Sequence, residues 1–166
     1  MAKKTITLTL YVSELVYDIQ NKTYLTGRSR QTGSNHEEVA NMQANDDDEN
    51  ANQVMRSIQN AFGTLKTKLA EWLNDDGTTS SDELMSITDK STLEVALNMP
   101  SNYNSSTRDA ISAALHQYIV NTAIGDWFTI TDKADASDYF TLATNNLEAI
   151  REAANKRIRP QRQSVS

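Results

Sequence analysis

The chain opens with a strict alternation of aliphatic residues and threonines, and this pattern limits its possible folds more than any other. Over residues 5–12 the apolar side chains occupy every second position: Ile6, Leu8, Leu10 and Val12. Successive side chains of a strand point to opposite faces, so a period of two is typical of a strand with one buried face. We therefore predict a β-strand over residues 5–12.

Three later segments carry apolar residues at spacings of three and four, which is typical of amphipathic helices. The first follows the acidic residues 46–49, the second opens near Ser106, and the third runs from Asp135 to Pro160. Their apolar faces comprise Val54, Ile58, Phe62, Leu65, Leu69 and Trp72 in the first, Ile111, Leu115, Tyr118, Ile119 and Ile124 in the second, and Tyr139, Ala143, Leu147, Ile150, Ala154 and Ile158 in the third. Three main helices are thus predicted.

Two segments between the first strand and the first main helix are less regular. Residues 13–26 fit a helical face that ends at Gly27, but their aromatic and β-branched residues also suit a strand, and both alternatives stay open. Residues 27–49 are polar and form a long loop, in which residues 36–44 are predicted to contain a short helix.

A β-hairpin is predicted between the first and second main helices. Its arms are residues 83–88 and 91–99, and residues 89–90 form its turn. With the N-terminal strand, the hairpin gives a small antiparallel sheet. The sequence therefore predicts a single α+β domain over residues 1–160, with three main helices packed on this sheet, and a basic tail at residues 161–166.

The composition excludes several classes of site. There is no cysteine, which rules out disulfides, thiolate nucleophiles and cysteine-ligated metal clusters and fits a reducing cytoplasm. The net charge of −6 opposes a surface built to grip phosphate. The N-terminal threonines interrupt any segment resembling a signal peptide, and no stretch approaches the roughly 20 apolar residues of a membrane span.

No residue pattern indicates catalysis or a bound cofactor. Residues 46–50 have the acidic spacing that opens a calcium-binding EF-hand loop. The sixth position of that loop, however, is Ala51 where glycine is needed, and the twelfth is Ser57 where glutamate is needed. His36 and His116 have no flanking ligand pattern, and neither a nucleophile motif nor a glycine-rich phosphate loop occurs. We therefore predict a non-enzymatic protein without metal or cofactor.

Candidate interface residues lie in three parts of the chain. They are the aliphatic face of the first strand (Ile6, Leu8, Leu10 and Val12), the aromatic pair Trp127 and Phe128, and the C-terminal arginines Arg157, Arg159 and Arg162. The strand is expected to pair at least partly with a neighbouring subunit, aromatic residues often dominate binding energies, and arginines bind nucleic acid or acidic grooves. The plainer alternatives are a core position for the aromatic pair and complementation of a helix C-terminus by the arginines.

Three stretches of the sequence carry a family resemblance. Residues 17–30, residues 42–50 with the helix that follows, and residues 114–121 through Arg159 and Pro160 together resemble structural proteins of tailed bacteriophages. The similar proteins come from phages and prophages of gut Bacteroides-type bacteria and are of the head-to-tail connector or neck type. The resemblance spans most of the chain.

The resemblance implies a ring of copies stacked below the portal, bound to the portal and to neighbouring neck or tail proteins. The chain would assemble in the host cytoplasm and remain at the head–tail interface of the virion. DNA would pass through the ring without specific binding, which suits an acidic subunit. Two alternatives stay open: another capsid or tail component of the same virion, and a small regulatory or nucleic-acid-binding protein that uses the basic C-terminus.

Overall fold

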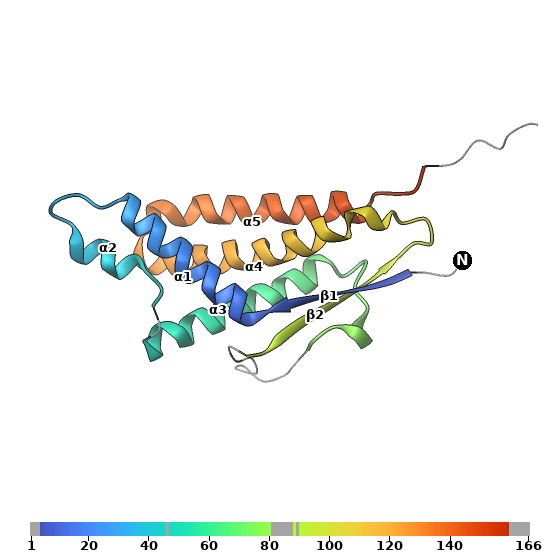
Figure 1. The fold of residues 1–166 in the computed structure, drawn as a ribbon, viewed down its shortest axis with the longest axis horizontal. Coiled ribbons are helices and arrows are strands. Elements are labelled where there is room, and N and C mark those ends of the chain that lie inside the picture. The colour runs from blue at the N-terminus through green and yellow to red at the C-terminus, as the bar shows by residue number, and fades with distance from the viewer. Residues whose placement is uncertain (1–3, 46, 81–87, 89, 160–166) are drawn as a thin grey trace, which may run out of the picture.

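The computed structural model describes residues 4–45, 47–80, 88 and 90–159. In chain order its elements are β1 (Lys4–Tyr11), α1 (Val12–Ser29), α2 (His36–Met42), α3 (Asp48–Lys68), β2 (Thr92–Met99), α4 (Arg108–Thr131) and α5 (Lys133–Ala154), with short 3-10 turns at Asp75–Gly77 and Ser105–Thr107. Figure 1 shows the helices lying lengthwise in an elongated molecule, with the two strands beside one end of the helical layer. The predicted α+β class is confirmed, and α1 adds a long helix to the three main ones because residues 13–26 are helical.

The sheet consists of β1 and β2, which pair antiparallel along their whole length. Lys4 lies opposite Met99 at one end, and Tyr11 lies opposite Thr92 at the other. The side chains of Ile6, Leu8 and Leu10 face the helices and are buried, whereas those of Lys4 and the odd-numbered residues of β1 are exposed. The alternation in the sequence is therefore the alternation between core and solvent, and the predicted N-terminal strand is confirmed.

The predicted hairpin lies only partly within the described residues. Its second arm is β2, but of its first arm only Thr88 is described. The edge of β2 that faces away from β1 is bonded in part to residues 72–79: Asn74 N–H donates to Ala96 O at 2.8 Å, and Thr79 N–H donates to Glu94 O at 3.0 Å. The pairing of residues 83–88 with β2 stays a prediction.

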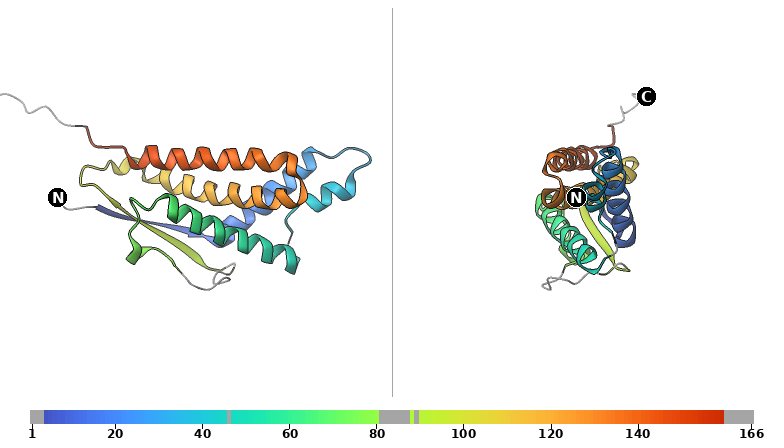
Figure 2. Two further views of the ribbon diagram at one scale, coloured as in Figure 1. Left: turned by 180° about the vertical axis from the view of Figure 1, so that it is seen from behind. Right: turned by 90° about the vertical axis from the view of Figure 1, so that its left-hand side faces the viewer.

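Helix α4 lies at the centre of the helical layer. Buried residues occupy all of its sides, because α5, α3 and α1 pack around it (Figure 1, Figure 2). The helices and the inner face of the sheet share one continuous hydrophobic core.

Polar contacts fix α1 to the α4–α5 pair. Thr26 and Tyr139 share a hydroxyl–hydroxyl hydrogen bond of 2.6 Å, and Lys22 Nζ donates to Gln117 Oε1 at 2.7 Å. At the end of α1, the Arg30 guanidinium pairs with the buried carboxylate of Asp135. This ion pair holds the pKa of Asp135 below its usual value. The contacts place α1 firmly along the side of α4.

The predicted helix ends need correction. Helix α3 stops at Lys68, before Leu69 and Trp72, although both of those side chains are buried. Helix α5 stops at Ala154, and Ile158 lies beyond it with 51% of its surface exposed. The short helix predicted in the polar loop is confirmed as α2.

No helix in the described part of the chain has both the length and the apolar character needed to cross a membrane.

Candidate protein-binding surface

The aliphatic face of β1 is not an interface on the surface of the subunit. Its side chains lie in the core, with exposures of 8% for Ile6, 5% for Leu8, 3% for Leu10 and 0% for Val12. They pack under the helices of their own chain, so a partner cannot contact them while the fold is intact. These side chains are therefore core residues, because alternation identifies a buried face without saying which chain covers it, and the expected pairing of the strand with a neighbouring subunit stays a prediction.

The aromatic pair is also part of the core. Trp127 is buried, and its indole N–H donates to Met42 O at 2.7 Å, which ties α4 to the end of α2. Phe128 is fully buried and its ring centre lies 5.4 Å from that of Tyr139 on α5. The interface role proposed for these two residues is therefore wrong, and their core alternative is correct.

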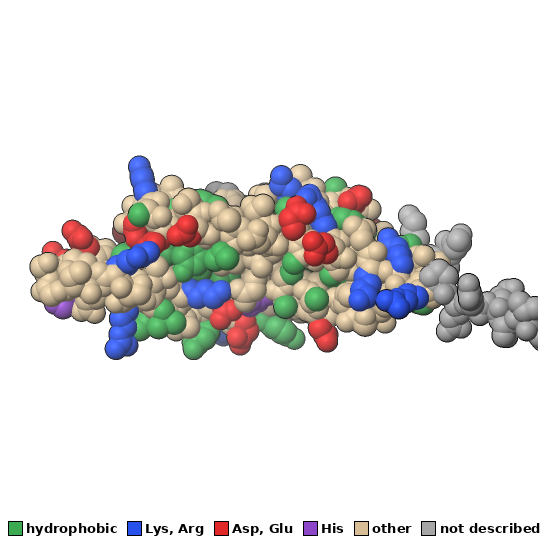
Figure 3. Space-filling model, turned by 90° about the horizontal axis from the view of Figure 1, so that it is seen from above, with side chains coloured by type: hydrophobic (Ala, Val, Ile, Leu, Met, Phe, Trp, Pro, Cys, Tyr) green, Lys and Arg blue, Asp and Glu red, His purple; other side chains and the backbone are tan. Residues whose placement is uncertain are grey.

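The C-terminal arginines have different surroundings. Arg157 Nη1 donates to Ala154 O at 2.7 Å, so this cation complements the carbonyl end of α5. The backbone around it is held by the loop before α4, because Asn104 N–H donates to Lys156 O and Ile158 N–H donates to Asn102 O. Arg159 is exposed, and Arg162 lies outside the described residues. Figure 3 shows basic side chains gathered at this end of the molecule.

A surface that single side chains do not reveal is the outer edge of β1. Val12 N–H donates to Ser91 O at 3.1 Å. Because backbone groups alternate in direction along a strand, the N–H and C=O groups of the even-numbered residues of β1 point towards β2. The odd-numbered residues direct their N–H and C=O groups away from it. We call this row of backbone groups, from Thr5, Thr7, Thr9 and Tyr11, the open edge.

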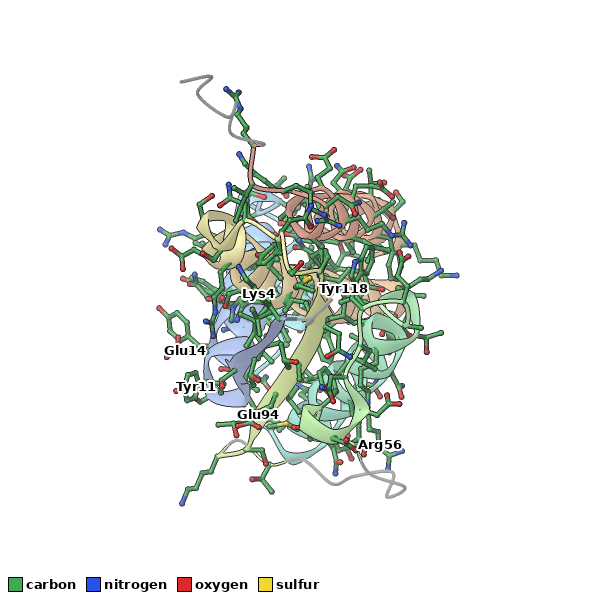
Figure 4. The ribbon with its side chains drawn as sticks, turned by 90° about the vertical axis from the view of Figure 1, so that its right-hand side faces the viewer. Lys4, Tyr11, Glu14, Arg56, Glu94 and Tyr118 are labelled. Atoms are coloured by element: carbon green, nitrogen blue, oxygen red, sulfur yellow. The ribbon has the colours of Figure 1, made fainter. Side chains whose placement is uncertain are left out.

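The open edge is almost without hydrogen-bond partners in the chain itself. Within the described residues, Arg108 Nη2 donates to the Thr7 carbonyl at 2.9 Å, and Tyr11 is the N-cap of α1, so its carbonyl belongs to the first turn of that helix. Beside the edge, β1 and the first turns of α1 and α4 enclose a shallow cavity of about 400 Å³. It is lined by Thr9, Leu10, Tyr11, Glu14, Asp109, Ser112, Ala113 and His116. Figure 4 shows Tyr11 and Glu14 projecting outwards on this side of β1.

The far wall of the cavity is held in place by the contact between α1 and α4. His116 Nε2 lies 2.5 Å from Asp18 Oδ2, and both side chains are largely buried. This histidine therefore has a structural position between α1 and α4. The edge and its wall belong to segments fixed to one core, so the surface is formed without any rearrangement.

The open edge lacks the features that usually protect an exposed strand. Edge strands are commonly blunted by charges, proline, bulges or a covering element, because their unpaired groups otherwise accept another strand. Between Lys4 and Glu14 this edge has no charged residue and no proline, and its pairing with β2 runs without a bulge. Its odd-numbered side chains are three threonines and a tyrosine, which favour strand formation.

Exposed aromatic side chains continue the surface along α1. Tyr11 is 57% exposed, Tyr17 62% and Tyr24 43%, and Tyr17 and Tyr24 are separated by two helical turns. Tyrosines offer a large contact area with a polar tip and are common in protein interfaces. Sequence reasoning missed this surface because backbone groups define the edge, and the only signal available was the threonine face of β1.

Among the described residues no group of three or more His, Asp or Glu side chains is arranged to hold a metal ion. The arrangement is suited to binding another polypeptide through its backbone. No protein-family model, no curated protein sequence and no solved structure matches the chain.

Proposed function

We propose that the protein is a non-enzymatic structural subunit of a tailed-bacteriophage virion. It forms a ring of copies at the head–tail connector and binds the portal and neighbouring neck or tail proteins. The observation that carries this proposal is the open edge of β1, a row of outward backbone groups most of which have no hydrogen-bond partner within the described residues, on a rigid core. Such an edge binds protein by strand addition and has no part in chemistry.

The charge of the chain supports a role beside passing DNA. With a net charge of −6, a ring of copies repels the phosphate backbone and lets DNA slide. Exposed basic residues, among them Lys156 and Arg159, lie just beyond the C-terminal end of α5. This end is suited to an acidic protein neighbour in the connector.

The test of this function is the size and shape of the purified protein. Native mass spectrometry and negative-stain imaging should find closed rings of many copies, formed alone or after addition of the portal protein of the same phage. A closed assembly without a central opening would favour a different capsid or tail component. A monomer or dimer under both conditions would contradict the proposal and favour a regulatory protein.

A further inference from the structure

The shallow cavity beside the open edge is acidic, and the chain itself carries a basic segment that suits it. We infer that the cavity takes up residues 156–159 of a second copy, so that the segment beyond α5 of one copy docks against β1 of the next. This inference rests on the proposed assembly function and names the contact between neighbouring copies.

The acceptor is the cavity of about 400 Å³ between β1 and the first turns of α1 and α4. Two of its lining residues are the exposed carboxylates Glu14 and Asp109, and neither has a salt-bridge partner within the described residues (Figure 4). The remaining ionisable lining residue, His116, is paired with Asp18. The cavity therefore presents two uncompensated negative charges to a neighbour.

The donor is the short extended segment beyond α5. The carbonyl of Lys156 and the N–H of Ile158 are bonded to residues 102–104 of the same chain. Because backbone groups alternate in direction along an extended segment, the N–H and C=O groups of Arg157 point away from that loop. The side chains of Lys156 and Arg159 are exposed, and Ile158 has 51% of its surface exposed.

Charge selects the end of the open edge at which the segment docks. Its two exposed cations balance the two carboxylates of the cavity, beside Thr9 and Tyr11. The other end of the edge carries Lys4 and the guanidinium of Arg108, which repel a basic segment. The segment therefore lies over the cavity and not over the start of β1.

Backbone and apolar groups complete the contact. Thr9 lines the cavity, and its N–H and C=O groups point outwards from the open edge. They can bond with the outward backbone groups of Arg157, in the manner of a strand added to a sheet edge. The exposed side chain of Ile158 then covers Leu10, an apolar residue of the cavity lining.

Donor and acceptor are different surfaces of one subunit. The segment leaves the end of α5 on the side of the helical layer that faces away from the sheet (Figure 1, Figure 2). Its bonds to residues 102–104 hold it there, so it docks on another copy and not on its own cavity. Contacts of this kind are head-to-tail, and they close into rings when the rotation between copies allows it.

Charge reversal of the donor tests its half of the contact. The donor variant is Lys156→Glu with Arg159→Glu, which leaves Arg157 in place at the end of α5. Its matched control is Arg28→Glu with Lys68→Glu, two exposed cations in the last turns of α1 and α3. Circular dichroism and thermal melting establish that these variants are folded.

The acceptor variant is Glu14→Lys with Asp109→Lys. Its matched control is Glu37→Lys with Glu38→Lys, which reverses two exposed carboxylates in the first turn of α2. Glu14→Gln with Asp109→Asn is a second acceptor variant that removes the two charges without reversing them. A further chain combines the donor reversals with the acceptor reversals, so that opposite charges face each other again.

Native mass spectrometry measures the assemblies under the conditions in which the wild type forms rings. The donor variant and the acceptor variants should lose the species above the monomer, and both controls should assemble like the wild type. The combined chain should form rings again. A donor or acceptor variant with rings of normal abundance, or a folded combined chain that stays monomeric, would overturn the inference and leave the proposed function intact. A wild type without rings, alone or with the portal protein, would contradict both.

Discussion

The approach of the two longest helices depends on the absence of a side chain at Gly125. This residue lies in α4, and the ring of Phe140 on α5 covers it. A Cβ atom at position 125 would lie 2.7 Å from Phe140 Cε1 and 2.9 Å from Phe140 Cδ1. A side chain at position 125 would therefore push the Phe140 ring aside, and glycine permits the present packing even though it lowers the intrinsic helix propensity.

Gly125→Ala is expected to lower the free energy of unfolding by up to about 2 kcal/mol. Overpacking costs about 1–3 kcal/mol, and the gain in helix propensity of about 1 kcal/mol offsets part of it. In a Phe140→Ala background the ring is absent, so the same substitution should stabilise the protein. Urea unfolding of the four proteins measures this coupling, and equal effects in both backgrounds would rule out the contact.

The carboxyl group of Asp126 makes the stability of the folded protein fall as the pH rises. Burial in α4 raises its pKa above the value in the unfolded chain. Its protonated form is therefore favoured by folding, and this contribution is complete below the unfolded pKa and is lost as the pH rises through the folded pKa. Asp126→Asn should be more stable than the wild type at neutral pH, with the difference vanishing in acid.

Thermal melting from pH 3 to 8 checks this expectation. Glu152→Gln is the matched control, because Glu152 is an exposed carboxylate on α5. The control should follow the wild type throughout. If Asp126→Asn also follows the wild type at every pH, then Asp126 is solvated in the folded protein.

Strand β1 has two distinct roles on its two sides. Its inner face belongs to the hydrophobic core of the subunit, and its outer edge is available to a partner. The two roles use different atoms, because side chains of even-numbered residues form the core and backbone groups of odd-numbered residues form the edge. Substitutions can therefore affect folding and assembly separately.

Leu8→Ala should lower the free energy of unfolding by about 2–5 kcal/mol, because it leaves a cavity in the core beneath the sheet. Thr9→Ala, one residue later, should change it by no more than about 0.5 kcal/mol, since this side chain is exposed. Denaturant unfolding of both variants makes the comparison. Similar losses for the two would show that β1 does not have one buried face.

Local sequence patterns predicted the elements better than their partners and ends. The period of two in β1 and the helical spacings of α3, α4 and α5 report which face of each element is buried, and these agree with the structure. The pairing of β1 with β2 joins distant parts of the chain, so no local pattern indicates it. Trp72 lies in the segment that follows α3 and is buried there. Its apolar side chain continues the helical spacing in the sequence, so the predicted helix was longer than α3. The sequence did not reveal the open edge, because the direction of the backbone hydrogen bonds of β1 depends on its register with β2.

The whole molecule is acidic but carries its charges unevenly. Basic residues lie where α4 begins and α5 ends. At the opposite end of the elongated molecule, Asp132, Asp135 and Asp138 lie at the start of α5 together with the cations Lys133 and Arg30 (Figure 1). A subunit of this kind attracts a neighbour through its ends and repels nucleic acid overall.

Duplex DNA is therefore expected to bind weakly at physiological salt. The dissociation constant should be weaker than about 1 μM, the tighter limit of ordinary non-specific binding. Fluorescence anisotropy with a labelled duplex measures it, and Arg159→Ala should leave the result unchanged. Tighter binding that depends on Arg159 would favour the nucleic-acid-binding alternative.

Assembly through the open edge is tested most directly by the mass of the wild-type protein beside Thr9→Pro and Thr9→Ala. Proline removes the outward N–H of Thr9, and alanine keeps it while removing the same side chain. Native mass spectrometry should find rings for the wild type and Thr9→Ala, and folded monomers with nearly wild-type melting for Thr9→Pro. Rings of unchanged size from Thr9→Pro, or monomers from the wild type, would contradict assembly through this edge.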